Sequence, residues 1–294
     1  MLSEITRFVN FLRRRNPTAD TAKSYQYHLR QFVQVVGDRS PGEVTLHDID
    51  DFIEFQAERG LTGSSINRSL TAVTSLYRFL ADEDPTLECP VLRHRHWLRD
   101  HQRLPRAVPK CEVEKLFAVI DDCPFDAAQG RRDKAIFLLM LRSGLRVSEV
   151  AKLTLRDLFL EEQPPRLRLQ GKNSRERAVY LSAQTFQALN RYLAQRPRVL
   201  NEAVFLTYEG TGIGVRGIQK RLQKYRQMAG VTLTAHQLRH NFASNLVLAD
   251  VPLASIQKLL GHRWVGTTQN YIDANDAKVK ADFIKAAEWL EAWQ

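Results

Sequence analysis

The sequence predicts a mostly α-helical protein with a small β-sheet, made of an N-terminal helical domain and a C-terminal α+β domain. Apolar residues recur at helical spacing along most of the chain. One short region, 166–181, instead alternates polar and apolar residues on either side of a turn. A basic, proline-interrupted stretch separates the two parts, and 294 residues suffice for about two domains.

Four amphipathic helices account for the N-terminal domain, which we expect to cover residues 1–88. We expect them at 3–14, from Thr18 to 36, at 46–59 and at 63–81. Ser3, Thr45 and Thr62 stand where helix N-caps belong, and glycines follow two of the apolar stripes. Short helices joined by tight loops predict a small all-α bundle.

Residues 89–108 are predicted to form a linker, because the run from His94 to Arg106 is basic and interrupted by proline. A basic linker can lie along a phosphate backbone. The C-terminal domain is then expected to cover residues 109–294. Helices are expected at 111–122, 130–142, from 147, at 182–193, 216–228, from Thr234, at 252–259, 265–271 and 277–293. Strands are expected at 166–169, 176–181 and 203–206, with Lys172 at the hairpin turn.

The charge is unevenly distributed between the two parts. Residues 1–104 hold 14 Lys/Arg and 14 Asp/Glu, whereas residues 105–294 hold 29 and 19, so the second part carries the whole net charge of +10. This excess favours a polyanionic partner, although many proteins are basic without binding nucleic acid. Three scattered cysteines argue against a disulfide scaffold or a zinc site. With no signal sequence and no long apolar run, we expect a cytoplasmic protein.

The stretch from His236 to Tyr271 concentrates groups suited to phosphate chemistry. Arg239 can grip a phosphate with two parallel hydrogen bonds, His236 and His262 titrate near neutral pH, and Tyr271 carries a hydroxyl that can attack phosphorus. Each piece alone is also typical of a solvated helix face, a helix C-cap or a packed aromatic ring. Their order and spacing together predict in-line attack on a phosphodiester that requires no metal ligands.

Five sequence pieces in this order resemble the tyrosine recombinase (phage integrase) family, and the layout is most similar to the bacterial Xer-type recombinases. They are Gly144-Leu-Arg-Val-Ser-Glu149, Gly171-Lys172, His236-Gln-Leu-Arg-His240, Leu259-Leu-Gly-His262 and Thr267-Thr-Gln-Asn-Tyr271. The resemblance covers nearly the whole chain. It implies a SAM-like, core-binding N-terminal domain that holds DNA and a tyrosine-recombinase catalytic domain.

The resemblance also implies a role for each matching residue. Tyr271 would attack the scissile phosphate and form a 3′-phosphotyrosyl bond, and Arg146 and Arg239 would clamp its oxygens. Lys172 would protonate the departing 5′-oxygen. His236 would assist proton transfer and His262 would bind the phosphate. Neither a metal nor a cofactor is implied. Many relatives carry a second lysine where this chain has Arg175, which favours Lys172 as the acid.

Two further residues have a supporting role in this interpretation. Glu149 is either an acid on a helix surface or a buried acceptor that orients Arg146, and His240 supports the cleft. Several basic side chains are candidates for DNA binding: Lys23, Arg30, Arg68, Arg78, Arg216, Lys220, Arg221 and Lys224. The first four, in the N-terminal domain, either face DNA or belong to an ordinary charged exterior.

The resemblance implies site-specific strand exchange on double-stranded DNA with inverted-repeat half-sites, by a dimer on one site and a tetramer on two. The helix at 277–293 would dock on the neighbouring protomer, or else pack on its own domain. Such a protein would act at the bacterial nucleoid, in integration or excision of a mobile element or in resolution. Two alternatives remain. One is a binding protein that uses the fold without the chemistry, and the other is a type IB topoisomerase.

Overall fold

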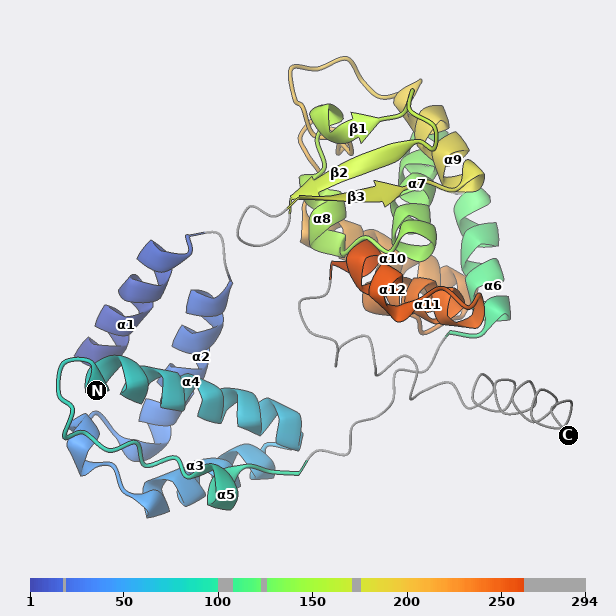
Figure 1. Ribbon diagram of the computed structural model, residues 1–294. Coiled ribbons are helices and arrows are strands. Elements are labelled where there is room, and N and C mark those ends of the chain that lie inside the picture. The colour runs from blue at the N-terminus through green and yellow to red at the C-terminus, as the bar shows by residue number, and fades with distance from the viewer. Residues whose placement is uncertain (18–19, 100–107, 123–125, 171–175, 262–294) are drawn as a thin grey trace, which may run out of the picture. The chain divides into compact units, whose positions relative to one another are not determined.

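The computed structural model describes residues 1–17, 20–99, 108–122, 126–170 and 176–261. The chain divides into two compact units, residues 1–102 and 103–294 (Figure 1). The predicted fold class is confirmed, since the units are mostly helical and the second holds a small sheet. The predicted helices at 265–271 and 277–293 lie outside the described residues. Among the described helices, none combines the length and the apolar character needed to span a membrane.

The N-terminal unit contains the four predicted helices. They are α1 (Leu2–Arg15), α2 (Thr21–Val36), α3 (Leu46–Glu58) and α4 (Gly63–Ala81), with a 3-10 turn at Pro41–Glu43 and a one-turn helix, α5 (Arg93–His96). Thr45 and Thr62 accept hydrogen bonds from backbone amides in the first turns of α3 and α4, as predicted. The expected cap at Ser3 is wrong. Ser3 lies inside α1, and its hydroxyl donates to the Glu4 side chain.

The apolar faces of the four helices meet in one core. Its largest fully buried side chains include Phe32, Phe52, Leu76 and Tyr77. The chain after α4 also packs on this unit. The Asn67 side chain donates to the carbonyl of Leu98 at 2.8 Å and accepts from its amide at 2.9 Å. The first half of the segment expected to be a linker therefore contacts the N-terminal unit.

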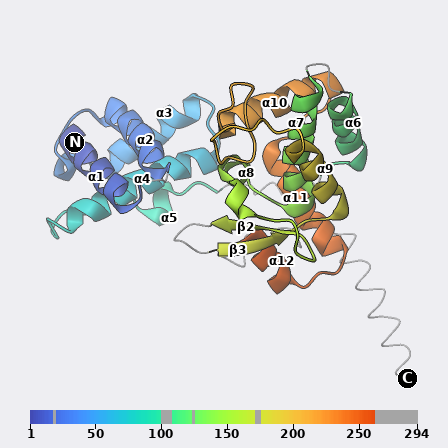
Figure 2. The ribbon, with the colours of Figure 1, turned by 90° about the horizontal axis from the view of Figure 1, so that it is seen from above.

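The second unit is built around one buried helix. Its helices are α6 (Lys110–Asp121), α7 (Ala127–Ser143), α8 (Val147–Lys152), α9 (Ala183–Leu193), α10 (Val215–Ala229), α11 (Ala235–Leu248) and α12 (Leu253–Leu260). Residues 135–141 of α7 are all buried, as expected for a helix that is apolar all round. It packs against α6, α8, α9 and α11 (Figures 1 and 2).

A three-stranded antiparallel sheet lies beside these helices. Its order is β1 (Leu158–Phe159), β2 (Arg166–Gln170) and β3 (Glu176–Tyr180), and β1 follows a 3-10 turn at Leu155–Asp157. The register pairs Leu167 with Val179 and Leu169 with Arg177, so these four side chains share one face. Both leucines and the valine are buried in the core of the unit, and this buried face fixes the register.

Two details of the predicted sheet differ. The strand β1 was not predicted, because two residues are too few to show an alternating pattern. The strand expected at 203–206 is absent, and this segment makes only isolated bridges, Thr154 to Ala203 and Leu206 to Gly212. Residues 204–206 are nonetheless fully buried. The apolar run reflects burial of an irregular segment, which length and composition alone do not distinguish from a strand.

Candidate active site

Arg146 is positioned by a sharp turn between two helices. Gly144 ends α7 in the left-handed conformation, with φ of 67°, and Arg146 is the N-cap of α8. A Cβ on Gly144 would lie 2.3 Å from the Phe242 ring, so the turn requires glycine for space as well as for φ. Arg146 therefore stands at the element junction that the sequence predicted. Its side chain keeps 42% of its surface exposed.

Glu149 gathers three arginines. Its carboxylate accepts from the Arg146 amide at 2.7 Å and from Arg146 Nη1 at 3.0 Å. The two terminal nitrogens of Arg177 each donate to a different Glu149 oxygen at 2.9 Å, and Arg239 Nη1 lies 3.7 Å from Oε2. Glu149 is thus a largely buried acceptor, with 12% of its side chain exposed. Burial alone would raise the pKa of Glu149, but Arg177 and Arg146 outweigh it, and the pKa is lowered.

Arg239 is held from the first turns of α11. Thr234 caps this helix and forms a capping box with Gln237. The Arg239 guanidinium is almost fully buried; it donates to the carbonyl of Gly144 and, at 2.6 Å, to that of Leu260. These carbonyls belong to the C-terminal ends of α7 and α12. Arg239 thereby joins three helices at the place where Arg146 and Glu149 meet.

His236 and His240 lie one turn apart on α11, with ring centroids 4.1 Å apart and planes at 87°. Burial, followed by the charges of Arg239 and Arg146, lowers the pKa of His236. Burial, His236 and Arg239 lower the pKa of His240 to about 4. Both imidazoles are therefore neutral near pH 7, and a neutral ring can accept a proton.

Three predicted site residues, Lys172, His262 and Tyr271, lie outside the described residues. The structure brings together Arg146, Glu149, His236, Arg239 and His240. It adds Arg177, which the sequence analysis did not single out. A signal was available, since β3 pairs Arg177 with a leucine of the alternating strand β2, and an arginine on a buried sheet face needs an anionic partner.

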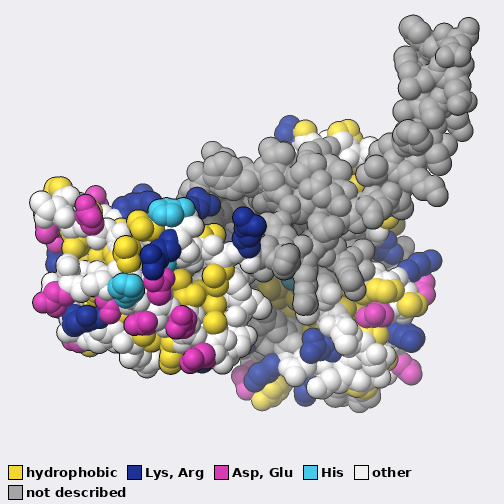
Figure 3. All heavy atoms as spheres, turned by 90° about the horizontal axis from the view of Figure 1, so that it is seen from below, with side chains coloured by type: hydrophobic (Ala, Val, Ile, Leu, Met, Phe, Trp, Pro, Cys, Tyr) yellow, Lys and Arg dark blue, Asp and Glu magenta, His cyan; other side chains and the backbone are white. Residues whose placement is uncertain are grey.

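The basic candidates of the N-terminal unit, Lys23, Arg30, Arg68 and Arg78, are all exposed. Two grooves, of about 580 and 630 Å³, run over this unit. Lys23 and Arg30 of α2 line the first, and Arg68 of α4 lines the second. Figure 3 shows basic, acidic and histidine side chains interspersed over one face of the unit. No single sign of charge dominates that face, in keeping with the balanced composition of residues 1–104.

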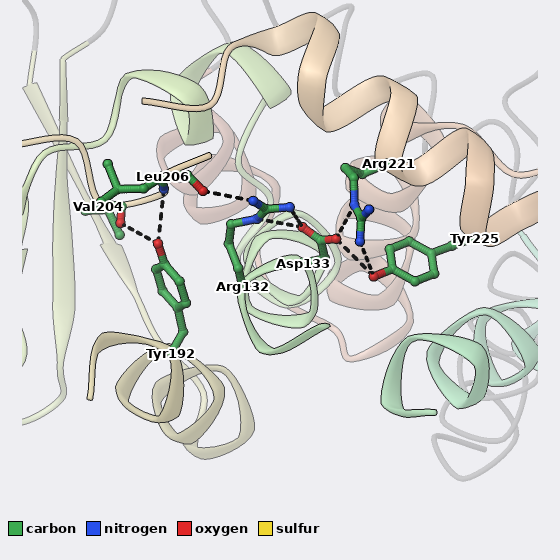
Figure 4. A network of polar contacts seen from close by, with 7 residues as sticks. All are labelled: Arg132, Asp133, Tyr192, Val204, Leu206, Arg221 and Tyr225. Atoms are coloured by element: carbon green, nitrogen blue, oxygen red, sulfur yellow. Dashed lines mark hydrogen bonds and ion pairs between the residues drawn. The ribbon is translucent and has the colours of Figure 1, made fainter. Parts of the chain in front are cut away.

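The basic helix α10 presents its candidates differently. Arg216, Lys220 and Lys224 are exposed, whereas Arg221 points into the unit. Arg221 Nε donates to Asp133 at 2.6 Å, and its Nη2 donates to the Tyr225 hydroxyl at 2.9 Å (Figure 4). Arg221 is therefore committed to a contact between α10 and α7, which does not fit the prediction that it faces DNA.

Asp133, on α7, is the centre of that contact. It has no exposed surface, and it also accepts from Arg132 Nε at 2.8 Å and from the Tyr225 hydroxyl at 3.0 Å. Arg132 Nη1 donates to the carbonyl of Leu206, and the Tyr192 hydroxyl bonds to the same irregular segment (Figure 4). The network fixes α10 and residues 204–206 to the buried helix α7.

Comparison with known proteins identifies the class to which this fold and site belong. The sequence profile of the phage integrase family matches residues 106–278, and that of the phage integrase N-terminal SAM-like domain matches residues 5–84. The chain therefore belongs to the phage integrase family, the tyrosine recombinases.

Individual relatives match along almost their whole length. The chain is 30% identical over 286 residues to the tyrosine recombinase XerD of Listeria monocytogenes, covering 93% of this chain and 94% of that one. It is 31% identical over 306 residues to XerC of Pelotomaculum thermopropionicum, covering 97% and 98%.

Solved structures share the fold. XerH site-specific recombinase bound to a palindromic difH substrate gives a TM-score of 0.76 at 21% identity, over 92% of this chain and 80% of that one. A lambda integrase dimer bound to a COC′ core site gives 0.74 at 15% identity, over 94% and 96%.

Proposed function

We propose that this protein is a site-specific DNA recombinase that cuts and rejoins strands through a 3′-phosphotyrosyl intermediate. The observation that carries the proposal is the convergence of Arg146 and Arg239 on Glu149, beside the neutral His236, in a chain of this family. Two arginines at one point suit a phosphodiester, whose negative charge grows as a fifth oxygen approaches phosphorus. Rejoining would conserve the energy of the broken bond and so would need no ATP.

The remaining roles rest on sequence position. Tyr271 would be the nucleophile, Lys172 the acid for the departing 5′-oxygen, and His262 a hydrogen-bond donor to the phosphate. His236 would accept the phenolic proton, which its lowered pKa allows near pH 7. Glu149 and His240 would support the arginines and His236 without touching DNA. The arginines would supply the charge stabilisation that a metal ion supplies in other phosphoryl-transfer sites.

The substrate we propose is double-stranded DNA with inverted-repeat half-sites, bound by a dimer on one site and a tetramer on two. The N-terminal unit would hold DNA through Lys23, Arg30, Arg68 and Arg78, and α10 through Arg216, Lys220 and Lys224. The boundaries 1–88, 89–108 and 109–294 stay a prediction. So does docking of residues 277–293 on a neighbouring protomer. The proposed substrate places the protein at the nucleoid, in the cytoplasm.

The central test uses a nicked suicide duplex, which traps a covalent protein–DNA adduct after cleavage. Wild-type protein should form the adduct, and Tyr271→Phe should lose it while retaining DNA binding in a gel-shift assay, because only the attacking oxygen has gone. Adducts that persist in Tyr271→Phe would contradict the assignment. Binding without any wild-type adduct would favour the alternative of a DNA-binding protein without chemistry.

The same assay tests the leaving-group acid. Lys172→Ala should cleave ordinary DNA slowly and recover on a 5′-bridging phosphorothioate, since a thiolate departs without protonation. Arg146→Ala should not recover, because its defect lies in stabilising charge on phosphorus. Equal recovery of both variants would refute this division of roles. Relaxation of supercoiled DNA without exchanged products would indicate a topoisomerase.

A further inference from the structure

Arg177 belongs to the cluster that Glu149 forms with Arg146, Arg177 and Arg239, called the arginine cluster below. It lies on β3, one residue after the strand begins, and its side chain is 12% exposed. Both terminal nitrogens are used on Glu149, one on each oxygen. The end of α12 packs on the same guanidinium, because a Cβ on Gly261 would lie 2.9 Å from Arg177 Nη1. Arg177 is thus enclosed, and its contacts are those of a residue that acts through Glu149.

The contacts of Glu149 show what Arg177 does there. A carboxylate offers about four lone-pair positions. Arg177 fills one on each oxygen, and Arg146 fills the others with its amide and with Nη1. Within the described part of the chain, Arg146 thereby gives Glu149 one guanidinium nitrogen and keeps 42% of its side chain exposed. Without Arg177, the two vacated positions would attract more of the Arg146 guanidinium.

The net charge of the cluster leads to the same conclusion. Arg146, Arg177 and Arg239 all lie within ion-pair distance of the Glu149 carboxylate, so three positive charges meet one negative charge there. A phosphodiester carries one negative charge and gains a second when a phenolate adds to phosphorus. Arg177 adds one positive charge at the point where this second negative charge would develop, and loss of Arg177 would remove it.

An arginine–glutamate pair on the neighbouring strand offers a comparison. Arg166 of β2 also makes two hydrogen bonds, from Nε and Nη2 to the two oxygens of Glu162, whereas Arg177 uses both terminal nitrogens. That pair is exposed, with 30% and 47% of the two side chains open to solvent, and neither residue contacts the cluster. Both pairs join an arginine of the sheet to a glutamate. They differ in burial and in the residues that surround them.

We propose that Arg177 is a positioning residue for cleavage, which neutralises Glu149 so that Arg146 is left to bind the scissile phosphate. The inference rests on the proposed function. Arg177 itself does not touch the DNA. Its removal should therefore slow formation of the covalent adduct and leave DNA affinity nearly unchanged.

The test compares single-turnover adduct formation on the suicide duplex, at protein concentrations that saturate DNA in a gel shift. Arg177→Gln should react about 10- to 100-fold more slowly, the range expected for a charged hydrogen bond. Arg177→Lys keeps the positive charge, so its rate of adduct formation should fall less than that of Arg177→Gln. The double variant Arg177→Gln/Glu149→Gln removes one positive and one negative charge, so the net charge of the cluster is that of wild type. It should recover most of the rate of adduct formation. Arg166→Gln, the matched control, should stay within about twofold of wild type.

These variants separate positioning from a merely structural role. If Arg177 only held the sheet in place, removing the carboxylate as well would restore nothing, and the Arg177→Lys and Arg177→Gln variants would be equally slow and equally less stable to heat. Either that pattern or a wild-type rate in Arg177→Gln would overturn the proposal. Should Arg177→Gln fail to fold, a folded but inactive double variant would overturn it as well. Failure of the proposed function differs, since wild type itself would then form no adduct.

Discussion

Replacing Asp133 by Asn should strongly destabilise the C-terminal unit. Asp133 is fully buried and accepts hydrogen bonds from Arg132, Arg221 and Tyr225 (Figure 4). Asparagine has nearly the same size, so it creates no cavity. It removes the negative charge and replaces one acceptor oxygen with an NH2 group that faces hydrogen-bond donors. The substitution therefore isolates the electrostatic contribution of the network.

The expected magnitude follows from burial of the two arginines. Arg132 and Arg221 have only 7% and 13% of their side chains exposed, so solvent replaces little of the lost counter-charge. Removing one partner of a buried ion pair destabilises a protein by about 3–5 kcal/mol. For a unit of this size, that corresponds to a fall in melting temperature of roughly 10 °C.

Urea unfolding followed by circular dichroism measures the change, and hydrogen exchange of peptides from α7 and α10 locates it. Glu162→Gln is the control, because it breaks a similar two-pronged contact with Arg166 at an exposed site and should cost less than about 1 kcal/mol. A loss for Asp133→Asn no larger than that of the control would refute the view that the network holds α10 to α7. Unchanged exchange in both helices would refute it too.

Two further predictions concern the turn before Arg146 and the paired histidines. Gly144→Ala should lower the free energy of unfolding by about 2–5 kcal/mol, measured by thermal unfolding, and should slow adduct formation. The reason is that φ is 67° and the new Cβ would meet the Phe242 ring. A stable, fully active variant would contradict this. The pKa of His240 is about 4 in the folded protein against an ordinary 6.5, so as pH falls the unfolded chain binds its proton first. Stability should therefore fall between pH 6.5 and pH 4 by roughly 2 kcal/mol, allowing for partial exposure, and His240→Gln should flatten the urea-unfolding profile over that range. An equal slope in wild type and variant would exclude His240 as the cause.

Local sequence was enough where local contacts decide the structure. The bounds of α4 match the prediction, because its apolar stripe and the Thr62 cap are both encoded within the helix itself. The same holds for the turn at Gly144, where a left-handed glycine ends α7 two residues before the N-cap of α8. The cap at Ser3 was wrong because a suitable residue type does not exclude a start one residue earlier.

The arginines show where local sequence no longer predicts the structure, because their partners are distant in the chain. Arg221 sits among basic residues on α10, yet its partner Asp133 is 88 positions away in the sequence. The spacing of the helix did contain a signal, since Arg221 falls between the buried residues Ile218 and Tyr225 on one face. Arg177 meets Glu149 across 28 positions, and only the register of β3 turns its side chain toward the cluster.

The contacts of Arg239 show how a buried arginine can be held in place and keep its charge. Its guanidinium donates to the carbonyls of Gly144 and Leu260, at the C-terminal ends of α7 and α12, where helix dipoles concentrate partial negative charge. Carbonyls satisfy the donors of a buried cation without neutralising it, whereas a carboxylate at hydrogen-bonding distance would cancel its charge. The formal anion of the cluster, Glu149, stays 3.7 Å from Arg239 and takes its closest side-chain hydrogen bonds from Arg177 and Arg146. The two carbonyls thus hold the Arg239 guanidinium in place while leaving its formal charge intact.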